Sequence, residues 1–281
     1  MKLAKYWVWD SVTANGVRVR CRGWSNESEA AAHRKAQQIG ETMARRIASG
    51  DMDTAETGYL YGDRPLPEPV LETLAGGLIT RNAYGAAVLN TSALMFLDVD
   101  REDPVQAPPA LDLLSGLRSL FGKPSAAPQA QPSPVVAEME AIARRNGVGL
   151  RIYRTAAGFR GIVTNRRFTP GSDEAQRLLK EFGCDPLYIR LCEAQESFRA
   201  RLTPKPWRCG LYPLPVKFPI EGQAAEGIVQ DWLRRYESNC ARNATCRFVH
   251  TTGPEATDPE LAALIARHDR DTKANTEMPL A

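Results

Sequence analysis

The sequence lacks any long apolar run. No stretch within its 281 residues approaches the roughly 20 consecutive apolar residues that a membrane-spanning helix needs. Residues 1–7 also lack the apolar centre of a signal peptide. We therefore expect a cytoplasmic protein with no membrane partner.

Cysteine and histidine are also scarce. Six cysteines are scattered through a chain that is too long for a disulfide scaffold, and there are three histidines. The spacing of Cys240, Cys246 and His250 resembles part of a zinc motif, but Asp231 stands where the first cysteine should be. A closed structural zinc site uses four ligands, so we expect no zinc. His268 is predicted to meet the dipole at the end of a helix rather than to catalyse a reaction.

Net charge is small, at +3, but positive charge is concentrated in one part of the chain. Residues 151–208 contain 12 Lys and Arg against 6 Asp and Glu, and the remaining residues contain 24 against 27. Such a local excess is typical of proteins that meet a phosphate-rich partner. A solvated basic face is the alternative, and charge alone does not separate the two.

The first 50 residues predict an accessory layer with no obvious chemistry. Residues 6–22 alternate apolar and polar side chains around Asn15-Gly16, which indicates a β-hairpin. A helix is expected over residues 27–48, capped by Ser25 or Asn26 and ended by Gly50. Residues 51–92 then form a connector with edge elements. We expect a helix at 70–75 and strands at 78–80 and 83–90.

The strongest pattern in the chain is the strand predicted at residues 93–100. Five apolar residues run directly into Asp98, Val99 and Asp100, as in a buried strand. Strand alternation places both carboxylates on one face, where they could hold a divalent cation. Without a neutralising partner, two such carboxylates would be costly to desolvate. The alternative is that Asp98 caps a turn and Asp100 is solvated.

The elements that follow predict an α+β core over residues 93–208. They alternate as strand–helix–strand–strand–helix–strand, at 93–100, 136–146, 148–155, 159–164, 172–182 and 198–203. Ser172 is expected to cap the helix at 172–182, and a further helix is expected at 187–194. This order builds a four-stranded antiparallel sheet with helices on one face and the other face open. A Pro/Ala/Gln-rich stretch at about 104–134 predicts a flexible insertion that contains one helix at 111–121.

A C-terminal extension completes the chain at residues 209–281. We expect a helix at 226–236, a strand at 245–251, a helix at 259–270 and a disordered tail after Asp271.

An apolar strand that ends in Asp98-Val99-Asp100 and opens such a core resembles the palm of archaeo-eukaryotic primases, primase-polymerases and nucleotide cyclases. The second primase-polymerase motif, Thr-Pro-Ser-Gly-Gly-x-His, corresponds to residues 154–160. Thr155 and Gly158 match it, and Arg160 occupies the histidine position. The third motif, an acid on the last strand, is replaced by arginines at 198–203.

This resemblance implies an RRM-like βαββαβ palm that binds nucleoside triphosphate, DNA or RNA. It also implies Mg²⁺- or Mn²⁺-dependent nucleotidyl transfer, with Asp98 and Asp100 as catalytic carboxylates and metal ligands. The missing third carboxylate weakens a second metal site, and Glu102, Asp103 and Asp185 are the acids that could replace it. Residues 198–208 also resemble a block in uncharacterised bacterial proteins, which transfers no activity.

Cations on neighbouring strands of the predicted sheet could bind phosphate, because guanidinium forks bind it bidentately. The predicted phosphate- or nucleic-acid-binding residues are Arg154, Thr155, Gly158, Arg160, Arg199, Arg201 and Lys205.

Other interpretations of the two carboxylates remain open. Haloacid-dehalogenase-like phosphatases follow the pair with Gly-Thr, whereas Arg101-Glu102 follows here. Glycosyltransferases place an Asp-x-Asp in a domain of parallel strands. A structural network, in which Arg154 or Arg199 pairs with the carboxylates, is the third alternative. The protein is therefore predicted to be a metal-dependent nucleotidyltransferase, or else a catalytically inactive palm-like nucleic-acid-binding or structural protein.

Overall fold

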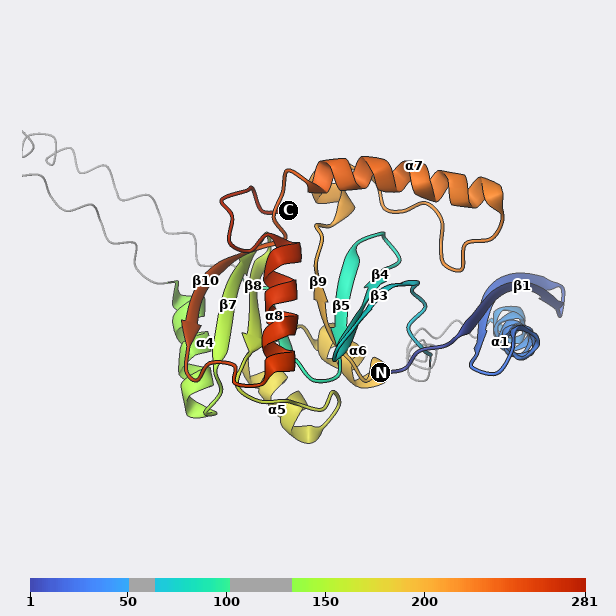
Figure 1. Cartoon of the computed structure of the whole chain (residues 1–281). Coiled ribbons are helices and arrows are strands. Elements are labelled where there is room, and N and C mark those ends of the chain that lie inside the picture. Colours follow the sequence, from blue (N-terminus) through green and yellow to red (C-terminus); the bar gives the residue numbers. More distant parts are fainter. Residues whose placement is uncertain (51–63, 102–132) are drawn as a thin grey trace, which may run out of the picture.

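In the computed structural model, the described residues are 1–50, 64–101 and 133–281. These ranges fold into antiparallel sheets and six α-helices (Figure 1), which confirms the α+β class. The predicted insertion at 104–134, with its helix at 111–121, lies outside the described residues apart from its last two. Within the described ranges, no helix combines the length and apolarity needed to cross a membrane.

The N-terminal residues form the predicted hairpin and helix, β1 (Tyr6–Ala14), β2 (Val17–Ser25) and α1 (Glu29–Ser49). Asn15 and Gly16 make the turn with φ of 52° and 75°, the left-handed conformation that Asn-Gly favours. The helix begins at Ser28, whose hydroxyl accepts from the Ala31 amide, so the predicted cap at Ser25 or Asn26 is wrong. Strand β2 continues to Ser25, so the helix begins later in the chain than predicted. Gly50 ends it as predicted.

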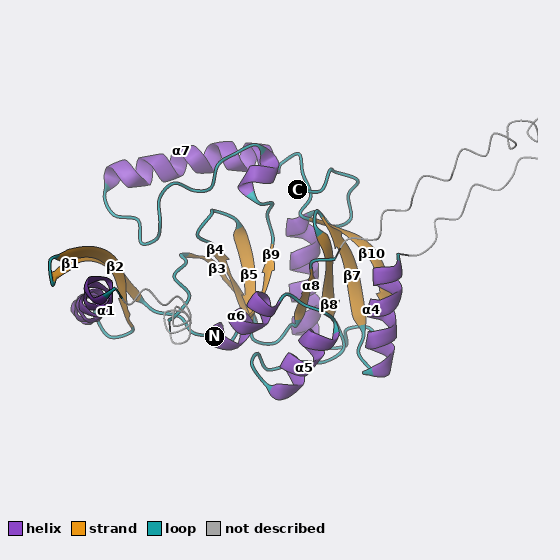
Figure 2. Cartoon of the chain, turned by 180° about the vertical axis from the view of Figure 1, so that it is seen from behind, coloured by secondary structure: helices purple, strands orange, loops and turns teal. Residues whose placement is uncertain are grey.

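One four-stranded antiparallel sheet has the order β10-β7-β8-β6. Figures 1 and 2 show α4 on one face of this sheet and α8 on the other. The face that we expected to be open is therefore covered. Its elements are β6 (Phe96–Val99), α4 (Pro134–Arg145), β7 (Leu150–Thr155), β8 (Gly158–Val163), β10 (Cys246–Thr252) and α8 (Pro259–Thr272).

A second four-stranded antiparallel sheet has the order β3-β4-β5-β9. Two predictions are wrong here. Residues 70–75 form a strand and turn rather than a helix, and the strand predicted at 198–203 pairs with β5 instead of completing the sheet of β6. Strand β10 takes that place beside β7. The strands of the second sheet are β3 (Val70–Leu74), β4 (Gly77–Arg81), β5 (Ala87–Thr91) and β9 (Phe198–Arg201).

The two sheets are joined by side-chain contacts rather than by a strand ladder, and one of these contacts comes from Tyr188. Between β8 and β9 the chain forms α5 (Asp173–Glu181) and α6 (Pro186–Gln195), which carries Tyr188. The Tyr188 hydroxyl donates to the Phe96 carbonyl at 3.0 Å and accepts from the Arg199 amide at 3.4 Å. Burial raises the pKa of this hydroxyl, so it stays protonated and able to bridge β6 and β9.

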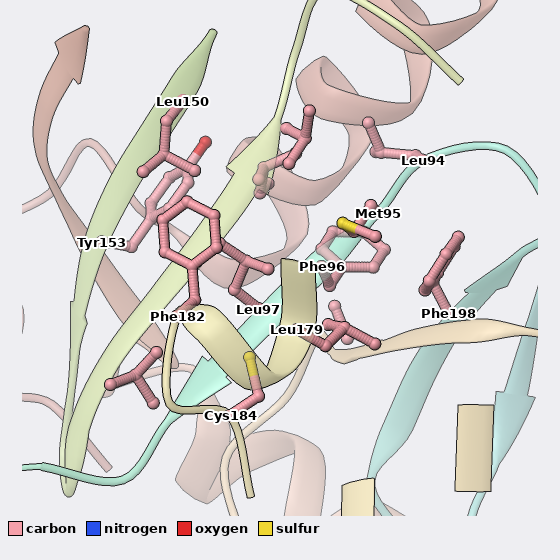
Figure 3. Packing of buried hydrophobic residues seen from close by; sticks show 14 of the residues in the cluster. Leu94, Met95, Phe96, Leu97, Leu150, Tyr153, Leu179, Phe182, Cys184 and Phe198 are labelled. Carbon is pink, nitrogen blue, oxygen red and sulfur yellow. The ribbon is translucent and has the colours of Figure 1, made fainter. Parts of the chain in front are cut away.

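The apolar run before Asp98 lies in the middle of the main hydrophobic core. Leu94, Met95 and Leu97 are fully buried. Each such side chain contributes about 1.5–3 kcal/mol on removal from water. Figure 3 shows this run packed among residues from both sheets and from α5, including Leu150, Tyr153, Leu179, Phe182 and Phe198. This packing anchors the strand that ends at the two carboxylates.

The C-terminal segment also differs from the prediction. Before it lie a 3-10 turn (Pro206–Cys209) and α7 (Gln223–Cys240). The residues after Asp271 are ordered against β10 rather than disordered. The Ala281 amide donates to the Ala244 carbonyl at 3.0 Å, and Arg247 Nη2 donates to the Met278 carbonyl at 2.9 Å. Ala281 is only 3% exposed. The polar composition of this segment does not reveal these backbone contacts.

Candidate functional site

An open groove of about 410 Å³ lies where the edges of the two sheets face each other. The side chains of β6 and β8 line one wall, and those of β5, β9 and α6 line the other. Its charged lining residues include Glu68, Asp98, Arg160, Arg199 and Arg201.

The two predicted carboxylates stand at the end of β6. Asp98 pairs in register with Arg160 of β8, so the two side chains share a face of the sheet. Asp100 follows the strand and is exposed. Gly158 permits this arrangement, since a Cβ there would lie 2.3 Å from the Val99 carbonyl oxygen. Gly158 therefore lies against the backbone beside Asp100, and its predicted part in phosphate binding stays a prediction.

Like charges are crowded on the acidic side of the site. The pKa of Asp100 is raised, first by partial burial of its carboxyl group and then by the carboxylates of Asp98 and Asp185, with Lys205 and Arg201 opposing the change. Asp185 is tied to the same strand end, because its amide donates to the Asp98 carbonyl at 3.2 Å. Asp98 and Asp185 therefore raise the free energy of the charged form of Asp100.

The basic side is crowded in the same way. The pKa of Lys205 is lowered, first by burial and then by Arg201 and Arg208, while Asp100 and Asp98 oppose the change. The Nε of Arg201 is buried and makes no hydrogen bond to any described residue. The site thus places a group of cations directly beside a group of acids.

The predicted third acid is accounted for only in part. Glu102 and Asp103 lie outside the described residues. Asp185 is close enough to raise the pKa of Asp100, but its Oδ1 accepts from the Leu187 amide at 2.6 Å and caps α6. In the part of the chain that the structure describes, no three His, Cys, Asp or Glu side chains are arranged to hold a metal ion. Two carboxylates suit Mg²⁺, which commonly takes its other ligands from water and substrate phosphates.

Arg199 has a carboxylate partner of its own. Its Nη2 lies 2.7 Å from both carboxylate oxygens of Glu68, and its Nη1 donates to Gln195 at 3.0 Å. The side chains of Arg199 and Glu68 are only 15% and 8% exposed. The guanidinium predicted to bind phosphate therefore forms a largely buried ion pair in the wall of the groove.

The hairpin residues do not converge as expected. In the register of β7 and β8, Arg154 lies opposite Phe159 and Tyr153 lies opposite Arg160, so Arg154 and Arg160 occupy opposite faces. Arg154 stacks over the Phe159 ring at 4.7 Å. Thr155 shapes the turn, since its hydroxyl accepts from the Ala157 amide at 3.3 Å.

Arg160 instead joins β8 to the second sheet. Its Nη1 donates to the Arg201 carbonyl at 2.8 Å, and the side chain is buried under α8. Four strand arginines were predicted to bind phosphate, and this contact brings two of them, Arg160 and Arg201, together.

His268 belongs to a buried polar network that the sequence analysis missed. Its Nε2 lies 3.1 Å from Nη1 of Arg160, and its Nδ1 lies 3.0 Å from Oδ1 of Asp269. Tyr153 donates to the same carboxylate at 2.6 Å, and Arg151 pairs with it at 2.7 Å. Burial, followed by the charge of Arg160, lowers the pKa of His268 to about 4. The imidazole is therefore neutral, donating to Asp269 and accepting from Arg160.

A sequence signal for this network exists in the spacing of α8. The buried side chains of this helix are Leu261, Leu264, Ile265, His268 and Thr272. This helical periodicity places His268 on the face that packs on the sheet, rather than at a solvated helix end.

Comparisons of the chain with protein-family models, with curated proteins and with solved structures found no match. The resemblance to primase-polymerases therefore stays a prediction, and any function has to be argued from the groove itself.

Proposed function

We propose that the groove binds the phosphates of a nucleotide or of a nucleic-acid strand, together with Mg²⁺ or Mn²⁺ at Asp98 and Asp100. The observation that carries this proposal is the pair of opposed charge clusters. In addition to burial, which is the larger cause of both shifts, the neighbouring acids raise the pKa of Asp100 and the neighbouring cations lower the pKa of Lys205. A divalent cation would relieve the repulsion among the acids, and a phosphate would relieve the repulsion among the cations.

The cations have distinct parts in this proposal. Arg201 offers a buried Nε that has no hydrogen-bond partner among the described residues, and Lys205 and Arg208 add charge beside it. Arg160 holds the Arg201 backbone in place through its hydrogen bond to the carbonyl. A bound divalent cation would supply charge neutralisation and Lewis acidity at the phosphate. The residues of the chain would orient that phosphate beside Asp98 and Asp100.

We further infer that the elements from β6 to α5 correspond to the first five elements of a palm-like βαββαβ core. Strand β9 lies beside β6, where Tyr188 bridges them, although β9 pairs with β5. On this basis the proposed activity is primase-polymerase-like nucleotidyl transfer. Asp185, which already influences Asp100, would serve as the third carboxylate.

A catalytically inactive palm-like nucleic-acid-binding or structural protein is the second candidate. It is favoured by the engagement of Asp185 as the cap of α6, which limits the carboxylates available for metal. The two candidates share the phosphate-binding groove and differ in turnover.

Metal binding is tested by calorimetric titration with Mn²⁺. Asp98→Asn combined with Asp100→Asn should abolish the binding heat while circular dichroism remains unchanged. Asp173→Asn combined with Glu193→Gln removes two exposed acids elsewhere and should leave binding intact. Equal Mn²⁺ binding by the wild type and the Asp98/Asp100 variant would refute the metal site.

Turnover is tested by incubating the protein with labelled nucleotides and Mg²⁺ or Mn²⁺, with and without a template. Incorporation that Asp185→Asn abolishes, with nucleotide binding retained, would support the transferase. Nucleotide or nucleic-acid binding without incorporation would support the inactive candidate. Absence of binding to nucleoside triphosphates, DNA and RNA at low salt would overturn the transferase and the nucleic-acid-binding protein, and would leave only the structural protein.

A further inference from the structure

The outer face of the β1–β2 hairpin carries an unusual row of side chains. Cross-strand register pairs Trp9 with Arg22, Ser11 with Arg20, and Thr13 with Arg18. Because side chains alternate along a strand, these six residues lie on one face of the ribbon. The face therefore combines three arginines, two hydroxyl groups and a tryptophan.

The opposite face of the ribbon is buried against α1. Val8 and Cys21 pack on Ala32 and Ala36 of the helix. A Cβ at Gly23 would lie 1.9 Å from the Ala32 carbonyl oxygen, which shows how closely the helix approaches. This packing decides which side of the hairpin faces outward.

The packing also places the acidic and basic side chains of the hairpin on opposite faces. Asp10 is the single acid between residues 6 and 25. Its Oδ2 lies 3.2 Å from His33 Nδ1 of α1, on the inner side of the ribbon. The arginines of β2 therefore project away from the one carboxylate of the hairpin.

Two of the three arginines are held in place by the indole ring of Trp9. The guanidinium groups of Arg20 and Arg22 lie 4.7 Å and 5.1 Å from the centre of the Trp9 ring. Such cation–π contacts order the side chains while leaving their N–H groups able to bind acceptors.

Part of this face is covered by residues 218–221. Trp9 Nε1 donates to the Pro219 carbonyl at 2.8 Å, and Arg22 Nη1 donates to the Phe218 carbonyl at 3.0 Å. The half nearer the turn remains accessible, since Ser11, Thr13 and Arg18 are exposed and the Arg20 side chain is 62% exposed. Glu221 contacts Arg20 at 3.3 Å, an exposed ion pair that a stronger anion could displace.

Figures 1 and 2 show the hairpin and α1 standing at one end of the molecule, away from the sheet of β6.

We propose that this outer face binds duplex DNA, with the two-stranded ribbon entering the major groove. The major groove of B-form DNA, about 12 Å wide, admits a two-stranded β-ribbon. Alternate arginines on a strand are about 7 Å apart, so Arg18 and Arg20 can contact separate phosphates or guanine edges. Serine and threonine hydroxyls such as those of Ser11 and Thr13 make common contacts to phosphates and bases. This surface is distinct from the groove, so the inference stands whether or not the groove binds a nucleotide.

The inference is tested by fluorescence anisotropy of the full-length chain with a labelled 20-base-pair (about two turns) DNA duplex over a range of salt concentrations. Arg18→Ala combined with Arg20→Ala should weaken binding about tenfold or more at low salt, and should flatten the log–log salt slope by about two. The matched control, Arg34→Ala combined with Arg45→Ala, removes two exposed charges from α1 and should change affinity by less than about twofold. Arg18→Lys combined with Arg20→Lys keeps the charge and should preserve the slope.

Three outcomes of the DNA-duplex assay would overturn the inference. They are an equal loss of affinity in the hairpin and α1 variants, a lysine variant as weak as the alanine variant, and no binding of the wild type to the duplex. Stronger binding to an RNA duplex would also overturn it, because the major groove of an A-form helix is too narrow for side chains to reach the bases. Stronger binding to a single strand would do the same, because a single strand has no major groove. Arg18→Ala combined with Arg20→Ala should bind Mn²⁺ and nucleoside triphosphates as the wild type does, which separates a failure here from a failure of the groove.

Discussion

Nη2 of Arg199 lies 2.7 Å from both carboxylate oxygens of Glu68, and this buried pair joins the start of β9 to the segment before β3. The Thr80 hydroxyl donates to the same carboxylate at 2.5 Å. The pair thus fixes one wall of the groove and prevents Arg199 from acting as a freely available phosphate ligand.

Replacement of Arg199 should therefore destabilise the fold. Arg199→Met leaves a buried carboxylate without its partner, and we expect a loss of about 3 kcal/mol in the free energy of unfolding, measured with urea. Glu68→Gln added to Arg199→Met should recover part of that loss, since no buried charge is then left. Arg145→Met, which breaks the exposed pair with Glu181, serves as the control and should cost much less. An Arg199→Met protein as stable as the wild type would contradict the buried-pair interpretation.

The buried histidine predicts an acid-sensitive fold. The pKa of His268 is lowered from 6.5 to about 4 by burial, so the unfolded chain binds a proton that the folded chain resists. The contribution of neutral His268 to the free energy of unfolding is fully present above pH 6.5 and is lost as the pH falls toward 4. The difference corresponds to about 3 kcal/mol. Although burial opposes it, hydrogen bonds from His268 and Tyr153 lower the pKa of Asp269, so that carboxylate stays charged over this range.

Urea unfolding at several pH values between 7 and 4 measures this effect. His268→Gln removes the titrating group and should flatten the dependence of stability on pH in that window, although it lowers stability at pH 7. If the wild type and His268→Gln show the same slope, His268 is not the group responsible.

The ordered C-terminal segment predicts that its removal is harmful. Deletion of residues 277–281 removes the hydrogen bonds from Ala281 to Ala244 and from Arg247 to Met278. We expect the melting temperature to fall by about 2–4 °C for each kcal/mol lost. Replacing the same five residues with Gly and Ser tests side-chain packing, because backbone bonding can then persist. An unchanged melting temperature after deletion would restore the expectation of a disordered tail.

The Pro/Ala/Gln-rich insertion remains predicted to be dispensable for folding. Its composition cannot bury enough apolar surface to offset the entropy of ordering, apart from residues 111–121. The Ser133 hydroxyl accepts from the Val136 amide and caps α4, so the deletion should end at residue 132 rather than 134. A short Gly/Ser link in place of 104–132 should keep the melting temperature within a few degrees. A collapse in soluble yield would show that 111–121 packs on the core.

The sequence by itself determined the features that depend on neighbouring residues. Asn15-Gly16 makes the hairpin turn, and Ser172 caps α5 as predicted, since its hydroxyl accepts from the Ala175 amide. The apolar run before Asp98 is buried as predicted, although the strand is shorter than the predicted 93–100 and covers Phe96–Val99. In each case, the conformational preference of a few adjacent residues is enough, because turns, caps and strand alternation are local properties.

Only the tertiary structure decided which strands pair and which charges meet. Residues 198–201 form a strand as expected, but this strand pairs with β5 rather than β6. Its Arg199 amide donates to the Tyr188 hydroxyl, and the Arg199 side chain pairs with Glu68, 131 residues earlier. The same holds for His268, whose partner Arg160 lies 108 residues away. Competition between sheet edges, and the sharing of buried charges, are settled by the packing of the whole chain, so no local pattern could reveal them.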